Sequence, residues 1–460
     1  MEDLTISIDT LGSITSAMSP QRIELSKKLF SELSGVMNEI HGTNFSERFW
    51  TLLLDGHVNA VISRKPLLEQ KEHHRKPDLY PVNGYTFPSS KQKIKKTAIR
   101  TVKWVLSMFN ERTVYKKVKN HDNLLLGFPA SEALKQEELG VSLPDFQPVI
   151  PFPGDKSKRK KVNKLAGNTE DLFLKNVIKE LPKILVEHFR HLYDRIPVYE
   201  PGKKTFHVHL LGTVLNEYLV AKYTEHGSKL FWYQHGGEYG EFRNDYTNYF
   251  SRQLADCFRT WGWKTCEKDE PWTAYRLEAF REEYEKYNKK ASYQILICYP
   301  EFNEKRWEEY VQFSHALFSG LNKKMYTKIL ARPRRLNKLH SHASQLSFIS
   351  DERVEVSSGL QPMMKEMSES ELVLQVNVPC TNFLECFFVD HPTIGILRND
   401  QPTDIVKPFY NFFLEEGVLH TDMNSLIRHL NRINITEWWT ELMKKEQYED
   451  FKDTFARSAN

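Results

Sequence analysis

The sequence predicts an α/β protein with two Rossmann-like domains and additional helices before them. Short apolar runs of strand length alternate with segments of helix length, first over 206–233 and again over about 290–410. A chain of 460 residues is too long for one ordinary hydrophobic core, so two domains are expected. Polar residues gather directly after the apolar runs, and in a parallel sheet this is the edge where ligands bind.

The N-terminal half is expected to begin with helices. Residues 21–65 carry apolar side chains at helical spacing, and 169–191 is a second helical stretch that Pro182 should break or kink. Prolines and turn formers mark loops between these two stretches. The strand that begins at Phe206, the helix after it and the strand 230–233 then form a parallel unit.

The C-terminal half repeats this alternation after a charged helix at 272–288. Five strands are expected, over 293–299, 325–331, 352–356, 371–376 and 392–397. The helices between them cover 308–321, 363–367 and the residues from 382 to 388. Short strands separated by helices are typical of a doubly wound parallel sheet. Two such domains facing a cleft would be a GT-B-like plan, the architecture known among glycosyltransferases.

Composition predicts a water-soluble, cytoplasmic protein. Hydrophobic residues make up 40% of the chain, and no apolar run approaches the roughly 20 residues that span a bilayer. The 64 basic and 60 acidic residues give a net charge of +4, which implies no general attraction to polyanions. The five cysteines form no Cys-x-x-Cys pair, so neither disulfides nor a zinc knuckle are expected.

Two local basic runs stand out, Lys91–Lys96 and Lys156–Lys161. We expect both to be solvated loops. The alternative is a peripheral contact with the cytoplasmic face of the inner membrane, at roughly 1 kcal/mol per basic residue close to anionic lipid. Nucleic acid is not an expected partner, because no recognition helix or RNA-binding module accompanies either run.

The most informative segment follows the strand 230–233 and reads Gln-His-Gly-Gly-Glu-Tyr-Gly over 234–240. His235 could act as a general base or donate to a phosphate. Glu238 or Glu241 could deprotonate an acceptor hydroxyl or hold the imidazole in one tautomer. A glycine turn around a buried, hydrogen-bonded histidine is the structural alternative, and both stay open. The neighbouring residues expected to contact substrate are Gln234, Gly236, Gly237 and Tyr239.

A second group of polar residues follows the strand 371–376. Thr381 or Asn382 is expected to cap the next helix, whose free amide groups suit a phosphate. Glu385, one turn further, could accept hydrogen bonds from a ribose. A plain helix cap with a carboxylate near the helix dipole is the structural alternative.

Basic and hydroxyl side chains follow two further strands. Arg332 should bind a diphosphate or a sugar carboxylate, because a planar guanidinium binds such groups bidentately. Arg334 and Arg335 are expected to belong to a charged surface loop. Ser357 and Ser358 could supply hydroxyl groups to the base or the phosphate.

No metal site is expected. His207 and His209 alternate along a strand and point to one face, as a pair of metal ligands would. However, no carboxylate or cysteine lies at ligand spacing nearby.

The same segments carry a family resemblance. The strings concerned are Asn38-Glu-Ile-His41 with Arg48-Phe-Trp50, Gln234-His-Gly-Gly-Glu-Tyr-Gly240, Asp256-x-Phe-x-Thr260-Trp-Gly-Trp263, and Thr381-Asn-Phe-Leu-Glu385 with His391-Pro-Thr. They resemble a family of transferases encoded in bacterial surface-polysaccharide (capsule or O-antigen) clusters, over about residues 30–430.

More distantly, the chain is similar to teichoic-acid glycerophosphotransferases and to bacterial ulosonic-acid transferases, which are GT-B-like and use cytidine nucleotides. This similarity implies that His235 belongs to a catalytic loop and Thr381 to a phosphate-binding loop. Val378-Pro-Cys380 replaces a serine-rich run, so the analogy ends there.

The sequence therefore predicts a metal-independent GT-B glycosyltransferase that moves a sugar from a nucleotide-sugar donor, a CMP-linked ulosonic acid among the candidates, to a glycan or lipid-linked acceptor. The nucleotide-sugar is a substrate, and no cofactor is expected. We expect an acceptor-side domain with N-terminal helices over 1–270, a nucleotide-donor domain over 290–430 and a C-terminal helix over 431–460. The alternatives are a CDP-alditol phosphotransferase, a non-catalytic glycan-assembly protein and a nucleotide-sugar epimerase.

Overall fold

The computed structural model describes nine stretches of the chain, and contacts divide the chain into two compact units. The described stretches are 20–70, 109–129, 139–144, 154–242, 246–287, 290–300, 307–334, 343–398 and 402–459. The N-terminal unit consists of 18–233 and 249–258, and the C-terminal unit includes 234–248 and 259–460. The loop 234–242 therefore belongs by its contacts to the C-terminal unit.

Helices dominate the start of the N-terminal unit, and they are shorter than the sequence predicts. The helices are α1 (Pro20–His41), α2 (Glu47–Ile62), α3 (Lys65–Gln70), α6 (Lys156–Gly167), α7 (Leu172–Lys179), α8 (Lys183–Val186), α9 (Phe189–Arg195), α10 (Val214–Glu225) and α11 (Tyr246–Leu254). The helix expected over 21–65 is interrupted because Gly42 takes a positive φ of 61° and Ser46 caps α2. The break expected at Pro182 is confirmed, since this residue is the N-cap of α8.

The basic run that begins at Lys156 is helical, so the prediction of a loop is wrong there. Asp155 caps α6 by accepting a hydrogen bond from the Ser157 amide at 2.9 Å. The helix buries Val162 and Ala166. The other basic run, Lys91–Lys96, lies outside the described residues.

The first sheet has the strand order β2-β1-β3-β4-β5-β6. Its strands are β1 (Asn123–Leu126), β2 (Val141–Ser142), β3 (Thr205–Val208), β4 (Lys229–Tyr233), β5 (Cys257–Thr260) and β6 (Asp269–Pro271). β1 pairs in parallel with β2 and β3, and β3 pairs in parallel with β4.

The second sheet has the strand order β12-β11-β10-β7-β8-β9, and its pairs are parallel. Its strands are β7 (Tyr293–Cys298), β8 (Ile329–Arg332), β9 (Val354–Val356), β10 (Ser370–Val378), β11 (Thr393–Leu397) and β12 (Leu419–His420). The five expected strands are confirmed. β8 begins four residues later than expected because Asn322–Tyr326 form a turn in which the amides of Met325 and Tyr326 donate to the Asn322 carbonyl.

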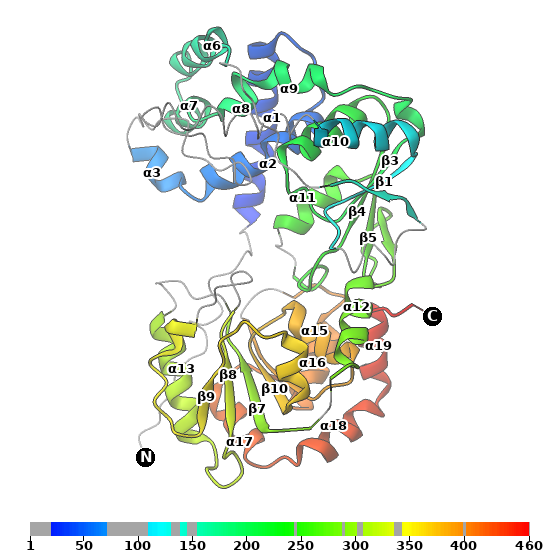
Figure 1. The fold of residues 1–460 in the computed structure, drawn as a ribbon. Helices are drawn as coiled ribbons and strands as arrows, with labels where there is room; N and C mark the ends of the chain where they lie inside the picture. Colours follow the sequence, from blue (N-terminus) through cyan, green and yellow to red (C-terminus); the bar gives the residue numbers. More distant parts are fainter. Residues whose placement is uncertain are drawn as a thin grey trace, which may run out of the picture. The chain divides into compact units, whose positions relative to one another are not determined.

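Helices lie on both sides of the second sheet (Figure 1). They are α12 (Tyr275–Tyr284), α13 (Trp307–Gly320), α14 (Met363–Ser368), α15 (Thr381–Phe388), α16 (Lys407–Glu415), α17 (Met423–Leu430), α18 (Ile435–Met443) and α19 (Glu446–Phe455). Alternate residues of β7 point to opposite faces of the second sheet. Ile295 and Ile297 join the apolar cluster with α13 and α17, whereas Leu296 and Cys298 join the cluster with α12 and α14. The predicted α/β class, with two parallel sheets and N-terminal helices, is confirmed.

Candidate functional site

The carboxyl ends of three neighbouring strands border a cavity in the C-terminal unit. β10, β7 and β8 are adjacent and parallel, so their carboxyl ends meet at one edge of the sheet. The cavity at this edge has a volume of about 510 Å³. Small-molecule sites commonly have roughly 300–1,000 Å³. The cavity therefore has the position and the size of a ligand site.

Four predicted site residues line this cavity. They are Glu238, Arg332, Thr381 and Asn382. The other lining residues are Arg276, Cys298, Tyr299, Pro300, Pro333, Arg334, Met363, Gln375, Asn377 and Cys380. Three arginines and one glutamate thus line the same space, and this excess of basic residues favours an anionic ligand.

Arg332 is held in place by partners behind the cavity wall. Its side chain is buried, pairs with Glu366 and donates from Nη2 to the Gln361 carbonyl at 2.9 Å. The Ser357 hydroxyl donates to the same Glu366 carboxylate. Ser357 is therefore close to Arg332 but not in the cavity wall, and Ser358 is an exposed residue outside it.

The loop 234–242 lies directly against the start of α15. The Gly237 amide donates to Thr381 Oγ1 at 2.9 Å. The prediction that Thr381 or Asn382 caps α15 is wrong, because Cys380 is the N-cap and its side chain makes no capping hydrogen bond. The Thr381 hydroxyl receives the loop instead, which brings the two groups predicted from sequence into direct contact.

Two glycines make this close approach possible. A Cβ atom at Gly237 would lie 2.8 Å from the Cys380 carbonyl carbon and 2.8 Å from the Thr381 amide nitrogen, closer than any side chain allows. Gly240 has a φ of 76°, and a Cβ atom there would lie 2.6 Å from the Trp263 ring. Gly237 and Gly240 therefore allow the loop backbone to pack closely against its neighbours.

Gln234 anchors the first residues of the loop. Its Oε1 accepts hydrogen bonds from the Trp261 amide and from Trp263 Nε1, both at 2.9 Å. Its Nε2 donates to the Gly236 carbonyl at 2.8 Å. The side chain is buried and does not line the cavity, so Gln234 holds the loop to the Trp261–Trp263 segment.

His235 is half-buried, contacts Tyr239 and is not among the residues that line the cavity. The Tyr239 hydroxyl is 2.8 Å from His235 Nδ1. Burial, assisted by the charge of Arg276, lowers the pKa of His235 to about 4. The imidazole is therefore neutral at pH 7, which fits both a general base and a structural histidine. Its main-chain carbonyl accepts a hydrogen bond from Arg276 Nη1 at 2.8 Å.

Glu238 is the carboxylate of the loop that reaches the cavity. It has a φ of 76°, which is unusual for a residue with a side chain and costs on the order of 1–3 kcal/mol. Its Oε1 lies 3.5 Å from Nη1 of Arg398, a guanidinium that is almost fully buried over the Phe242 ring. The surrounding contacts thus hold a strained residue with its carboxylate at the cavity.

Glu241 fixes the end of the loop and is fully buried. Its carboxylate accepts hydrogen bonds from the Tyr410 hydroxyl at 2.5 Å and from the Glu238 amide at 3.0 Å. Burial raises the pKa of Glu241 to about 7. Thr403 adds two hydrogen bonds, from its amide to the Glu241 carbonyl and from its hydroxyl to the Gly240 carbonyl. Glu241 does not line the cavity and holds the loop to α16 and to the segment that precedes it.

Arg276 connects the loop, the cavity and α15. It lies in the first turn of α12, and its Nη2 lies 3.8 Å from Glu385 Oε1. Burial raises the pKa of Glu385, and the Arg276 charge opposes this shift. Glu385 is buried and is not part of the cavity wall, so its observed partner is Arg276.

Sequence reasoning missed several of these residues. Arg276 lies in a helix with many interleaved charges and no local pattern distinguishes it. Arg334, interpreted as a surface residue, lines the cavity, and Arg335 lies outside the described residues. Arg398 and Asn377 could have been found, because each stands at the carboxyl end of a predicted strand.

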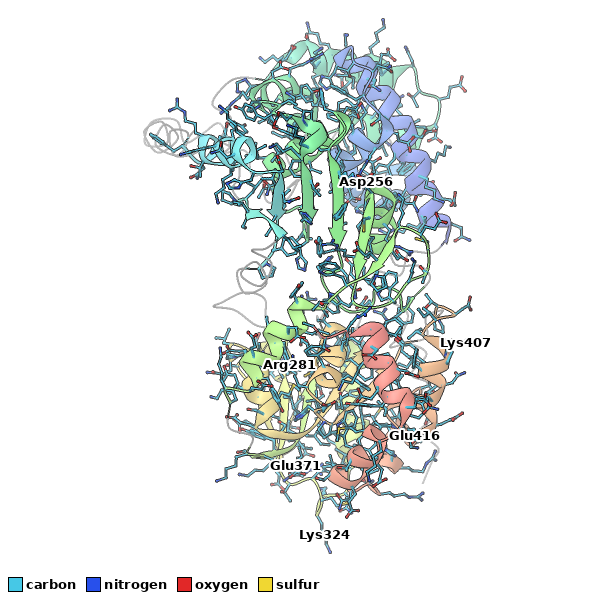
Figure 2. The ribbon with its side chains drawn as sticks, turned by 90° about the vertical axis from the view of Figure 1, so that its right-hand side faces the viewer. Asp256, Arg281, Lys324, Glu371, Lys407 and Glu416 are labelled. Carbon is cyan, nitrogen blue, oxygen red and sulfur yellow. The ribbon has the colours of Figure 1, made fainter. Side chains whose placement is uncertain are left out.

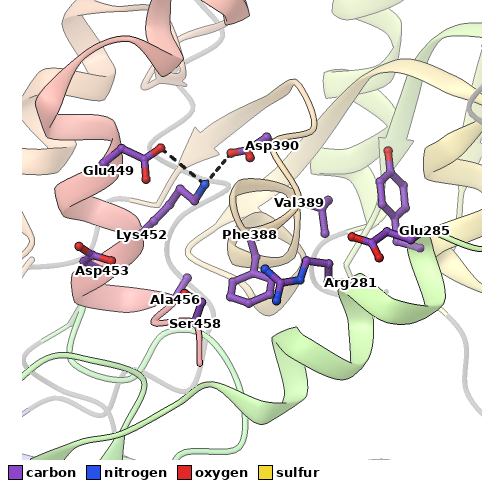
Figure 3. A pocket seen from close by; sticks show the side chains of 11 residues that line it. Arg281, Glu285, Phe388, Val389, Asp390, Glu449, Lys452, Asp453, Ala456 and Ser458 are labelled. Atoms are coloured by element: carbon purple, nitrogen blue, oxygen red, sulfur yellow. Dashed lines mark hydrogen bonds and ion pairs between the residues drawn. The ribbon is translucent and has the colours of Figure 1, made fainter. Parts of the chain in front are cut away.

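A second, smaller cavity of about 240 Å³ lies between α12, the end of α15 and α19 (Figure 3). Lys452 Nζ contacts Asp390 Oδ1 at 2.7 Å and Glu449 Oε1 at 3.6 Å. Arg281 lies 5.1 Å from the centre of the Phe388 ring and pairs with Glu278. The basic groups of this cavity are therefore neutralised by their own neighbours.

The histidines of β3 and the segment after it have local partners. His207 Nδ1 lies 2.9 Å from the Tyr233 hydroxyl, and His209 stacks on Phe128 with ring centres 5.1 Å apart. Among the residues that the structure describes, no three or more His, Cys, Asp or Glu side chains are grouped as a metal site would require.

Comparison with known proteins gives one family and several distant structures. The profile of the LIC12162 family transferases matches residues 63–460. A structure of the wall teichoic acid polymerase TagF is 12% identical, with 80% of this chain and 93% of that chain covered and a TM-score of 0.37. A glycosyltransferase from Rickettsia africae ESF-5 is 10% identical, with 76% and 95% covered and a TM-score of 0.30. No curated protein matches the chain.

Proposed function

We propose that this chain, which belongs to the LIC12162 family of transferases, moves a sugar from a nucleotide-sugar donor to a bacterial surface glycan. The observation that supports this most directly is the 510 Å³ cavity at the carboxyl ends of β10, β7 and β8, with three arginines in its wall. A nucleotide-sugar presents one or two phosphate groups, and a planar guanidinium binds phosphate bidentately. A CMP-linked ulosonic acid adds a carboxylate and is therefore our preferred donor.

The nucleotide phosphate would bind between Arg276, Arg332 and the start of α15. The first amide groups of a helix and its dipole stabilise negative charge, and Thr381 and Asn382 stand there in the cavity wall. When the bond between the anomeric carbon and the phosphate oxygen breaks, the nucleotide leaves with the electron pair. Fixed positive groups then stabilise the charge that develops on it, without a metal ion.

The proton of the acceptor hydroxyl would pass to the loop 234–242. As that oxygen attacks the anomeric carbon, a base must take its proton, and Glu238 is the loop carboxylate that lines the cavity. His235, which is neutral and beside the Tyr239 hydroxyl, is the second candidate of our proposal. Glu241 would act by holding the loop.

A thermal-shift screen followed by a transfer assay tests the proposal. The screen compares CMP, CDP, UDP and GDP and their sugars, and we expect one nucleotide class to raise the melting temperature. With that donor and a surface-glycan acceptor, His235→Ala and Glu238→Gln should each lose most turnover at unchanged melting temperature. Full turnover by both variants would refute the roles of these residues.

The product decides between the proposal and its alternatives. Phosphorus in the new linkage would identify a phosphotransferase that uses a CDP-alditol. Conversion of the nucleotide-sugar without any acceptor would identify an epimerase. If no nucleotide or nucleotide-sugar stabilises the protein, a non-catalytic role in glycan assembly is favoured and the transferase proposal fails.

A further inference from the structure

Helix α6 presents a row of exposed lysines. Lys156, Lys160 and Lys164 are four residues apart, so they lie along one face of the helix, and exposed Lys161 lies beside them. Figure 1 shows α6 at the edge of the N-terminal unit, next to α7. The helix itself, Lys156–Gly167, has six basic residues and no acidic one.

The inner face of α6 fixes which side chains point outward. Val162 and Ala166 are buried. Lys158 donates to the Ile40 carbonyl at 3.1 Å, and Arg159 pairs with Glu187 at 2.9 Å. Because these residues tie the helix to α1 and to the end of α8, the lysine row cannot rotate inward without breaking these contacts.

The exposed lysines of α6 differ from those of α1 in their pairing. None of the four forms an ion pair within the part of the chain that the structure describes. Lysines on the neighbouring helix α1 are different, since Lys27 pairs with Glu24 and Lys28 with Glu32. Among the residues that the structure describes, no carboxylate neutralises the positive charge of the α6 face.

We propose that this face of α6 docks the protein on an anionic lipid surface, independently of the reaction at the cavity. Anionic lipid headgroups attract clusters of lysines electrostatically. Each lysine near the surface changes the partitioning of the protein onto the membrane by about fivefold. Nucleic acid is the less suitable partner because the exposed row has neither arginine nor aromatic side chains for bidentate contacts or base stacking. The one arginine of the helix, Arg159, is turned inward to Glu187.

Co-sedimentation of the full chain with vesicles tests this proposal. We expect binding to phosphatidylcholine vesicles that contain phosphatidylglycerol, weak binding to phosphatidylcholine alone, and release by salt. The triple variant Lys156→Gln, Lys160→Gln and Lys164→Gln should bind the anionic vesicles roughly a hundredfold more weakly.

A variant with the same change in net charge provides the control. Lys323, Lys324 and Lys328 are exposed in the C-terminal unit, and Lys324 points away from the ribbon in Figure 2. Their replacement by glutamine should leave vesicle binding within about twofold, well below the fivefold effect of one surface lysine. Equal losses in both triple variants, no loss in the α6 variant, or no binding by the wild type would each overturn the proposal. Tighter binding to duplex DNA than to anionic vesicles would favour nucleic acid instead.

Discussion

The two cavities of the C-terminal unit contain similar residue types but organise their charges differently. In the smaller one, Lys452 is neutralised by Asp390 and Glu449, which lie on the same rim. In the larger one, Arg332 and Arg276 have their acidic partners, Glu366 and Glu385, outside the cavity wall. The lysine of the smaller cavity thus shares that cavity with its acidic partners, whereas Arg332 and Arg276 line the larger cavity and their acidic partners do not.

The position in the fold explains this difference. The larger cavity stands where three parallel strands end, so side chains from several segments converge on one space. The smaller one is bordered by helix flanks, where neighbouring turns supply charges of both signs. Arg332 and Arg334 of the larger cavity thus lie at the end of β8, whereas the basic side chains of the smaller cavity come from helices.

The largest effect is expected for Glu238→Gln. This change removes the carboxylate of the larger cavity without altering its volume, and loss of a general base typically lowers turnover by about 10²–10⁴-fold. Nucleotide affinity should stay the same, as measured by calorimetry. Glu285 is a carboxylate of the smaller cavity. An equal loss of turnover for Glu285→Gln would contradict a functional difference between the two cavities.

Burial of Glu241 makes the free energy of unfolding depend on pH. Its pKa is raised from 4.5 to about 7 in the folded protein, so the folded state binds the proton more tightly. The resulting contribution to stability is present below pH 4.5 and is lost as pH rises through about 7, up to on the order of 3 kcal/mol.

Denaturant titrations across this pH range test the prediction. Glu241→Gln should flatten the decline in the free energy of unfolding between pH 4.5 and 7. The pKa of His235 is lowered to about 4, so its effect on stability has the opposite pH dependence. Its contribution to the free energy of unfolding is lost as pH falls from 6.5 to 4. A decline that persists unchanged in Glu241→Gln would contradict the assignment.

Arg276→Met should weaken nucleotide binding by roughly 10–100-fold, because a hydrogen bond to a charged group contributes about 1.5–3 kcal/mol. Arg281→Met is the matched control, since this arginine lies on the same helix but lines the smaller cavity. We expect its affinity to be that of the wild type. Calorimetric titration with the nucleotide found in the screen measures both.

The smallest effect is expected for Lys452→Met in the smaller cavity. The change removes ion pairs that are partly exposed, each contributing about 0.2–1 kcal/mol, and leaves the partly buried Tyr448–Asp390 hydrogen bond in place. The melting temperature should fall slightly while turnover and nucleotide affinity stay unchanged. A marked loss of turnover would give the smaller cavity a functional role.

The fold could be predicted from the sequence because its strands are short apolar runs bounded by turns. β7 and β10, whose middle residues are all buried, correspond closely to the expected segments. Helix ends were less predictable. Gly42 and Ser46 interrupt the first helical region by local conformation, which apolar spacing does not reveal.

The candidate site could be predicted only in part. Strand ends identified Arg332, Thr381 and the loop that contains Glu238, and all three contribute to the cavity wall. The hydrogen bond from Gly237 to Thr381 joins residues 144 positions apart, and Arg276 reaches the wall from a helix. Local residue patterns do not indicate such long-range contacts. The partners and the burial of these site residues are therefore known only from the structure.

The loop 234–242 has a consequence for recombining this chain with its relatives. It is encoded between two strands of the first sheet, yet Glu241, Thr403 and Tyr410 fasten it to the C-terminal unit. A chimera spliced between residues 258 and 259 would combine a loop from one parent with the receiving surface of the other. Functional exchange of the C-terminal unit therefore requires that residues 234–248 be exchanged with it.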